Sequence, residues 1–258
     1  MKIRLLPSSF ESNGSASGRQ HSACFVINGC VALDAGSLAS GIKDEERSNI
    51  LDVVLTHAHL DHIAGLPLFL DDLFPVLTEP VRVHASSEVI DALETHIFNW
   101  KIYPRFSELR NEFGSVIEYV EIKEGTEFRI RDLTFSAIPV NHRVPSNGFL
   151  IRDGKSAVAF TGDTAEMSDF WGVVNETENL RSLFIECAFP NEFEELADIS
   201  HHLTPRKLKL ELEKLRVRID EVYVINIKPA YRETIVSQLA GLGDVRLKVF
   251  QTGRKYSF

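Results

Sequence analysis

Thr56-His57-Ala58-His59-Leu60-Asp61-His62 places four metal-competent side chains directly after an apolar segment, Ile50 to Thr56, that predicts a strand. Alternate side chains of an extended segment point to one side, so His57 and His59 can face the same ion. Asp61 and His62 fall at the turn into the next helix, where they can reach a second ion. Imidazole nitrogen and carboxylate oxygen suit Zn, Mn or Fe. Three of the nine histidines lie within six residues, which argues against a solvated loop with chance histidines.

The composition is that of an ordinary soluble globular protein, with 44% hydrophobic and 25% charged residues in a chain of 258. A formal charge of −9 argues against a broad surface for phosphate backbones, and hence against a large nucleic acid as partner. A small anionic substrate remains compatible with this charge, because bound metal ions supply local positive charge.

The chain lacks the marks of a membrane or secreted protein. No run approaches the roughly 18 apolar residues of a spanning helix, and the opening segment Met1 to Pro7 is followed at once by polar Ser8-Ser9. The three cysteines form neither a CxxC motif nor an even disulfide framework. We therefore expect a cytoplasmic protein with no membrane partner, and the sequence is compatible with a homodimer.

Short apolar runs bounded by turn residues predict many strands, and the longer segments between them predict helices. The predicted strands are Cys24 to Leu33, Ile50 to Thr56, Val81 to His84, Val116 to Ile122, Leu133 to Val140, Phe149 to Arg152, Ala157 to Thr161, Leu183 to Glu186, Val222 to Ile227 and Val245 to Phe250. The predicted helices are Ile63 to Leu73, Ser86 to Trp100, Glu166 to Val174, Pro205 to Leu215 and Tyr231 to Leu239, with Thr204 as a cap before Pro205. This order predicts an α/β (α+β) protein with two sheets flanked by helices, in a single domain over residues 1–258.

The HxHxDH pattern of residues 57–62 resembles the metallo-β-lactamase superfamily, whose fold is a four-layer αββα sandwich with two mixed β-sheets. The family's later ligands have counterparts here, since His142 follows the strand Leu133 to Val140 and Asp163 lies in Thr161-Gly162-Asp163-Thr164. The resemblance implies two divalent metal ions. It implies that one ion is held by His57, His59 and His142, the other by Asp61 and His62, with Asp163 bridging them.

Segments away from these ligands resemble the class II cyclic-nucleotide phosphodiesterases of that superfamily. They are His96 to Ser107, Leu183 to Asn191, His202-Leu203-Thr204-Pro205 and Val224 to Pro229. The resemblance implies hydrolysis of a small 3′,5′-cyclic nucleotide of the cAMP or cGMP type, by attack of a metal-activated hydroxide on phosphorus. Zinc is the favoured metal, with Mn or Fe as alternatives.

Individual side chains in these segments have plainer interpretations as well. Phe98, Trp100, Tyr103 and Phe106 are interpreted either as a core-facing helix end, the more usual fate of aromatic clusters, or as a substrate wall. Glu186 is interpreted as a charge at a strand end, and Cys187 as a small buried apolar residue.

The resemblance also implies catalytic roles. Asp61 orients or deprotonates the attacking water, and His202 is the candidate general acid for the departing ribose oxygen, since an imidazole pKa near neutrality suits proton transfer. His202 has an alternative interpretation as a residue at the entry to the next helix.

Two departures from the family pattern concern the second metal. Asn226 stands where the family has a histidine ligand, and His201 replaces a glycine before His202. Asn226 can offer a carbonyl oxygen, a harder donor that favours Mn or Fe, or His201 or His202 supplies the missing nitrogen.

Three rival functions stay open. The tRNA 3′-processing enzymes share most of these motifs, but they usually carry a long basic insertion where only 20 residues, Arg143 to Gly162, separate His142 from Asp163. Thioester hydrolysis is conceivable but finds no support in residues 96–107. A non-hydrolytic metal or nucleotide sensor with a degenerate second metal site is the remaining alternative.

Overall fold

The computed structural model describes all residues from 1 to 258 and divides into two compact units. Unit 1 comprises Met1–Lys123 with Thr252–Ser257, and unit 2 comprises Glu124–Gln251 with Phe258. Each unit contains one seven-stranded mixed sheet with helices. The predicted α/β class with two mixed sheets is therefore confirmed, whereas the single domain over residues 1–258 stays a prediction. No helix combines the length and apolar character needed to cross a membrane.

Unit 1 begins with a hairpin and continues through parallel strands connected by helices. Its strands are β1 (Lys2–Leu5), β2 (Phe25–Ile27), β3 (Val31–Leu33), β4 (Asp52–Val54), β5 (Val81–Ala85), β6 (Arg110–Asn111), β7 (Gly114–Ser115), β8 (Ile117–Glu121) and β16 (Lys255–Ser257). Its helices are α1 (Leu38–Gly41), α2 (Asp44–Arg47), α3 (Leu60–Ile63), α4 (Gly65–Leu73), α5 (Ser87–Ala92), the π-helix η1 (Leu93–Ile97) and the 3-10 turn η2 (Phe106–Glu108).

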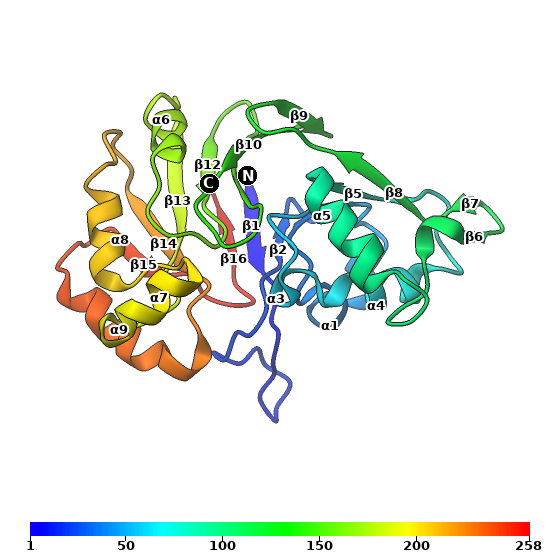
Figure 1. Cartoon of the computed structure of the whole chain (residues 1–258), viewed down its shortest axis with the longest axis horizontal. Helices are drawn as coiled ribbons and strands as arrows, with labels where there is room; N and C mark the ends of the chain where they lie inside the picture. The colour runs from blue at the N-terminus through cyan, green and yellow to red at the C-terminus, as the bar shows by residue number, and fades with distance from the viewer. The chain divides into compact units, whose positions relative to one another are not determined.

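The sheet of unit 1 has the order β16-β1-β2-β3-β4-β5-β8. Pairing is antiparallel from β16 to β3 and parallel from β3 to β8. On one face, Val53 and Val83 belong to the same core cluster as Leu66 and Phe69 of α4, and α1 lies next to α4 (Figure 1). Burial of this apolar face positions the loop that follows β4.

Unit 2 follows the same order, with an antiparallel meander first and parallel strands with helices after it. Its strands are β9 (Glu127–Ile130), β10 (Leu133–Pro139), β11 (Asn147–Arg152), β12 (Ala157–Phe160), β13 (Leu180–Glu186), β14 (Glu221–Ile225) and β15 (Leu247–Val249). Its helices are α6 (Asp169–Asn175), the 3-10 turn η3 (Asn191–Phe193), α7 (Glu194–Ser200), α8 (Pro205–Leu212), the 3-10 turn η4 (Pro229–Tyr231) and α9 (Arg232–Gly241).

The two faces of the unit 2 sheet differ in character because side chains alternate along each strand. Leu183 and Ile185 of β13 belong to a cluster that includes Phe170 of α6 and Leu208 of α8, and Figure 1 shows α7, α8 and α9 grouped together beside β14. Phe184, between them, instead stacks on Phe160 with ring centroids 4.0 Å apart. One face of the sheet is thus aliphatic and covered by helices, and the other is aromatic.

Some predicted elements are wrong in their bounds. Cys24 to Leu33, predicted as one strand, is the hairpin β2–β3, because Asn28 and Gly29 take positive φ angles of 50° and 75° and turn the chain. The helix predicted to run to Trp100 ends in η1 at Ile97. The cap before Pro205 is confirmed, since the Thr204 side chain accepts a hydrogen bond from the Lys207 backbone N–H.

Candidate metal centre

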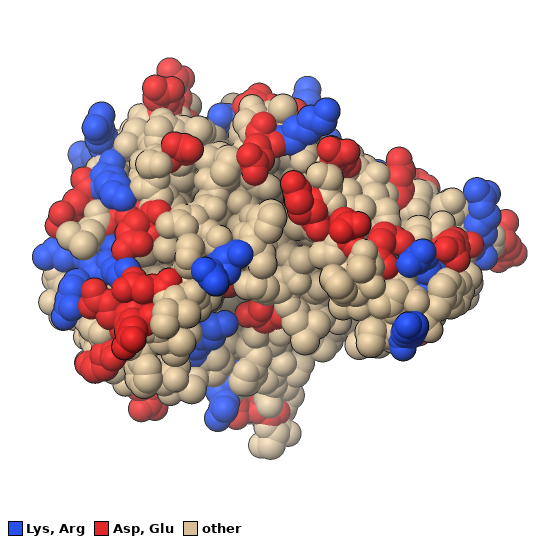
Figure 2. Space-filling model, viewed as in Figure 1, with Lys and Arg blue, Asp and Glu red and all other residues tan.

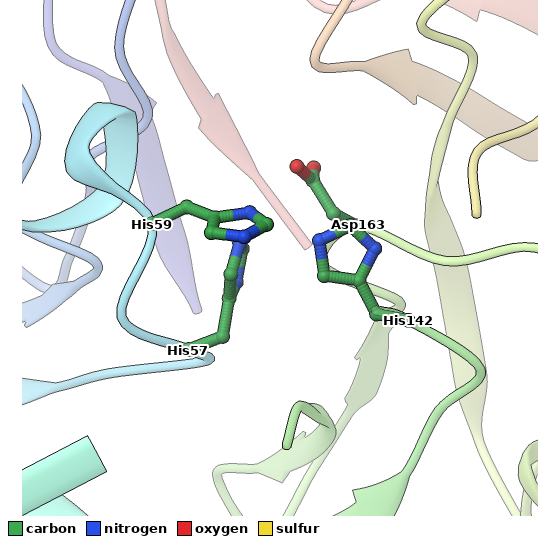
Figure 3. A group of neighbouring side chains, drawn as sticks. All are labelled: His57, His59, His142 and Asp163. Carbon is green, nitrogen blue, oxygen red and sulfur yellow. The ribbon is translucent and has the colours of Figure 1, made fainter. Parts of the chain in front are cut away.

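The histidine cluster of unit 1 occupies the loop between β4 and α3. His57 follows the buried strand end, His59 precedes Leu60, and His62 lies within the short helix α3. The ring of His57 lies 4.7 Å from that of His59 and 4.2 Å from that of His62, measured between centroids. Figure 3 shows the side chains of His57 and His59 on this loop. The structure therefore brings the three predicted histidine ligands of unit 1 together.

A buried carboxylate orients two of these rings. Asp34, at the end of β3, lies 2.7 Å from Nδ1 of His62 and accepts hydrogen bonds from the backbone N–H and the hydroxyl of Thr56, each at 2.9 Å. Because the Thr56 hydroxyl donates to Asp34, its oxygen accepts from Nδ1 of His57, which lies 2.9 Å away. Both imidazoles thus carry their proton on Nδ1 and keep Nε2 for a metal ion.

Asp61 is held through its backbone. Its carbonyl oxygen accepts from the Ala23 backbone N–H at 2.9 Å, and Gly36 passes so close that an added Cβ would lie 1.8 Å from the same oxygen. Only glycine fits there. The Asp61 side chain itself is half-buried, next to His62 in α3.

In unit 2, His142 follows the strand β10 and Asp163 follows β12, which belongs to the same sheet. His142 is half-buried, and its Nδ1 donates to the backbone carbonyl of His201 at 3.1 Å, which again leaves Nε2 for a metal ion. Asp163 is 3% exposed and follows Gly162, whose φ of 63° turns the chain at the strand end.

His202 pairs with a fully buried carboxylate. Glu186, at the end of β13, accepts from Nδ1 of His202 at 2.6 Å and from the backbone N–H groups of Thr164, Ala188 and Leu203. Ligand atoms of Asp163, Glu186 and His202 lie within 4.8 Å of one another. The ring of His202 lies 5.1 Å from that of His142, so the structure groups His142, Asp163 and His202 of unit 2.

The Glu186 carboxylate determines the protonation of His202. Burial lowers the pKa of His202, but the charge and hydrogen bond of Glu186 outweigh burial, so the net shift is upward from the ordinary value. Burial raises the pKa of Glu186, whereas His202 lowers it, with a net upward shift. Because every contact to the two Glu186 oxygens comes from an N–H donor, we describe Glu186 as a carboxylate that accepts from Nδ1–H of His202.

Asn226 contacts Asp163 directly. It follows β14 with a φ of 54°, and its Nδ2 donates to Oδ1 of Asp163 at 2.6 Å. His201 also has a positive φ, 55°, where α7 ends, and its Nδ1 lies 2.9 Å from Oδ1 of Asn141. In this arrangement Asn226 holds a predicted metal ligand through its amide N–H.

The donor atoms of both units fit divalent metal ions. His57, His62, His142 and His202 each have Nδ1 occupied by an oxygen partner, and Asp61 and Asp163 add carboxylates. Zn, Mn and Fe accept this mixture of imidazole nitrogen and carboxylate oxygen. Carbonyl or carboxylate partners behind metal-binding imidazoles are the usual second layer of such sites.

Sequence reasoning missed Asp34 and the partner of Glu186. Glu186 lies at the end of β13 as predicted, but it is 0% exposed and accepts from His202, a contact that the sequence did not indicate. Asp34 and Glu186 each lie at the end of an apolar strand, and this position was the sequence signal that could have indicated a role in the site. Cys187 is buried as predicted, and so are Phe98 and Phe106, which belong to the core of unit 1, whereas Trp100 is 56% exposed.

Comparison with known proteins identifies relatives over most of the chain. A family model described as "Beta-lactamase superfamily domain" matches residues 33–220. A probable 3′,5′-cyclic-nucleotide phosphodiesterase of Yersinia pestis is 27% identical over 233 residues, 78% of this chain and 66% of that protein. The 3′,5′-cyclic-nucleotide phosphodiesterase 1 of Saccharomyces cerevisiae is 25% identical over 245 residues, 79% of this chain and 66% of that protein. The chain therefore spans about two thirds of the length of these curated relatives.

One further relative matches a shorter part of the chain, and two solved structures share its fold. A ribonuclease Z of Leuconostoc mesenteroides is 31% identical over 102 residues, 38% of this chain and 29% of that protein. The structure of unliganded yeast PDE1 aligns over 98% of both chains with a TM-score of 0.76 and 18% identity. The metallo-beta-lactamase fold protein YhfI of Bacillus subtilis aligns over 99% of both chains with a TM-score of 0.74 and 13% identity. These neighbours confirm the metallo-β-lactamase fold, and because the family model matches most of the chain, the chain belongs to the beta-lactamase superfamily domain family.

Proposed function

We propose that the chain is a metal-dependent phosphoric diester hydrolase that acts on a 3′,5′-cyclic nucleotide of the cAMP or cGMP type. The observation that carries the hydrolase proposal is a feature common to His57, His62, His142 and His202. The Nδ1 atom of each imidazole contacts an oxygen atom, as is usual for imidazoles that bind a metal ion or transfer a proton through Nε2. The substrate class is supported by the names of the relatives matched over 72–79% of the chain.

The proposed ligand set is the one that the family resemblance implies. The proposed ligands of one ion are His57, His59 and His142, those of the second are Asp61 and His62, and Asp163 is shared. The family model supports this assignment because residues 33–220 include every one of these positions. Zinc is the favoured metal, and Mn or Fe are the alternatives that an oxygen-rich second site favours.

In the proposed reaction, Asp61 acts on the attacking water and His202 acts on the leaving group. When bound, two divalent ions lower the pKa of a bound water and neutralise the negative charge that builds on the phosphoryl oxygens. Asp61 orients that water or accepts its proton. His202, held at Nδ1 by Glu186, presents Nε2–H to the departing ribose oxygen, and Glu186 raises the pKa of this imidazole, which favours the form that carries the proton.

The charge of the surface supports a small substrate rather than a long nucleic acid. Acidic and basic side chains are interspersed over the face shown in Figure 2, and the whole chain carries a formal charge of −9. Because affinity for a phosphate backbone comes mainly from clustered Lys and Arg, recognition by the metal site alone suits a mononucleotide better.

A substrate screen tests the proposal. The full chain is reconstituted separately with Zn, Mn and Fe and offered cyclic AMP, cyclic GMP, bis(p-nitrophenyl) phosphate, a thioester and a tRNA precursor. We expect turnover of a cyclic mononucleotide that His57→Ala abolishes. Faster cleavage of the tRNA precursor or of the thioester than of any cyclic nucleotide would overturn the substrate class.

Two further functions have a specific observation behind them. The similarity to ribonuclease Z over 102 residues favours RNA 3′-processing as the second candidate, which the tRNA arm of the screen tests. Asn226, which contacts Asp163, favours a non-hydrolytic sensor with one tight metal site. Binding of cyclic AMP without turnover in every metal form would support the sensor.

A further inference from the structure

A pocket of about 210 Å³ opens in unit 1 away from the histidine loop, among β1, β2, α2 and β16. We call it the β1 pocket, and its lining is Lys2, Ile3, Arg4, Val26, Asn28, Gly29, Glu46 and Lys255. It is smaller than the roughly 300–1,000 Å³ typical of pockets for drug-sized ligands. A ligand for it must therefore be small.

The β1 pocket is cationic although the chain as a whole is acidic. Lys2, Arg4 and Lys255 contribute three positive charges against the single negative charge of Glu46, which leaves a formal +2. Glu46 accepts from Nη2 of Arg4 at 2.5 Å and from Nζ of Lys255 at 3.5 Å. One carboxylate is thus shared between two cations, and Lys2 remains without an ion-pair partner.

The side chain of Arg4 in this pocket has an unsatisfied hydrogen-bond donor. The residue is 8% exposed, yet its Nε–H has no hydrogen-bond partner. A buried guanidinium donor without a partner is less stable than a satisfied donor, so a ligand oxygen that accepts this bond gains affinity. The planar donors of arginine match the oxygens of phosphate and carboxylate groups.

We propose that the β1 pocket binds a small phosphate-bearing anion, either inorganic phosphate or a small phosphate monoester. Arg4 Nε–H donates to one phosphate oxygen, and the ammonium groups of Lys2 and Lys255 neutralise the remaining charge. A phosphate dianion matches the formal +2 of the pocket, which a singly charged carboxylate does not. This site does not depend on the metal ligands or on the proposed hydrolysis.

Nuclear magnetic resonance of the metal-loaded full chain tests the site. The ¹⁵N-labelled protein is titrated with sodium phosphate, with glycerol 1-phosphate and with sodium chloride at matched ionic strength. The Arg4 Nε–H resonance is assigned by its loss in Arg4→Lys. We expect saturable shifts of this resonance and of the Asn28 and Gly29 amides with one or both phosphate compounds, and none with chloride.

Lysine variants separate a site from a general charge effect. We expect Lys2→Gln and Lys255→Gln each to weaken phosphate binding about tenfold, the usual order for a hydrogen bond to a charged group. Lys43→Gln is the matched control, because Lys43 is 66% exposed at its side chain and lies outside the pocket. Absent shifts, equal shifts with chloride, or an equal loss of affinity in Lys43→Gln would overturn the proposal.

Discussion

The Oδ2 atom of Asp34 lies 2.7 Å from Nδ1 of His62, across 28 residues of sequence. A carboxylate only accepts hydrogen bonds, so this contact selects the His62 tautomer with its proton on Nδ1. Through Thr56, the same carboxylate also controls Nδ1 of His57. One buried side chain therefore prepares two candidate ligands before any ion binds.

Asp34→Asn is expected to weaken metal binding by about 10–100-fold, the usual effect of removing a partner behind a ligating imidazole. The amide loses one acceptor oxygen and can no longer serve both Thr56 and His62. Competition with a chromogenic chelator measures the affinity. The control is Asp44→Asn, whose side chain is 97% exposed. Equal affinities in the two variants would exclude this role for Asp34.

His202→Ala is expected to lower turnover of the substrate by about 10²–10⁴-fold, as removal of a general acid does. Glu186→Gln, a change of a positioning residue, has a distinct signature. Because Glu186 raises the pKa of His202, its removal lowers that pKa, and activity that requires protonated His202 then falls at a lower pH. The measurement is kcat against pH. A uniform loss at every pH would mean that Glu186 acts only in folding.

Asn226→His is expected to raise the occupancy of the second metal about tenfold, because it adds an imidazole beside Asp163. Asn226→Ala removes the donor to Asp163 and is expected to lower occupancy. Metal equivalents per chain at limiting metal measure both. Asn179→His is the control, since Asn179 has a similar φ of 56°. Unchanged occupancy in both Asn226 variants would separate this residue from metal binding.

The stability of unit 1 is expected to depend on Asp52 below pH 4. Burial raises the pKa of Asp52, but hydrogen bonds from His84 and Arg82 outweigh it and lower the pKa to about 2. A depressed carboxyl pKa stabilises the fold above the unfolded value of about 3.9, by about 2 kcal/mol, and this stabilisation is lost as the pH falls towards 2. Urea unfolding of the parent chain and of Asp52→Asn at pH 6 and pH 3 measures the difference. If the two chains differ in free energy of unfolding as much at pH 3 as at pH 6, the lowered pKa of Asp52 would be contradicted.

The local pattern of the sequence predicts strands that are continuous apolar runs, but it does not predict strands that are short and partly polar. The segments Ile50 to Thr56 and Leu133 to Val140 contain β4 and β10 as predicted. β1 and β16 were missed because each is short and partly polar, and their stability comes from pairing with each other across almost the whole chain. Such pairing leaves no local periodicity to detect.

The candidate site shows the same limit. His57, His59, Asp61 and His62 could be predicted because the HxHxDH pattern is local, and His142 and Asp163 could be predicted from the family resemblance. The structure groups the predicted residues of each unit. The roles of Asp34 and Glu186 could not be predicted. Their partners, His62 and His202, are distant in the sequence and reach these carboxylates only in the folded chain. The contact between Asn226 and Asp163 spans 63 residues and was hidden for the same reason.

The pairing of Lys2 with Ser257 has a consequence for biosynthesis. β16 leaves the ribosome only after residues 124–251 of unit 2, so one edge of β1 stays without its partner strand while these residues are translated. At roughly 5–20 residues per second, this exposed edge persists for roughly ten seconds on each nascent chain. Unpaired strand edges recruit other chains, and the nascent protein is therefore most open to aggregation, and to chaperone binding, after its histidine loop has already been made.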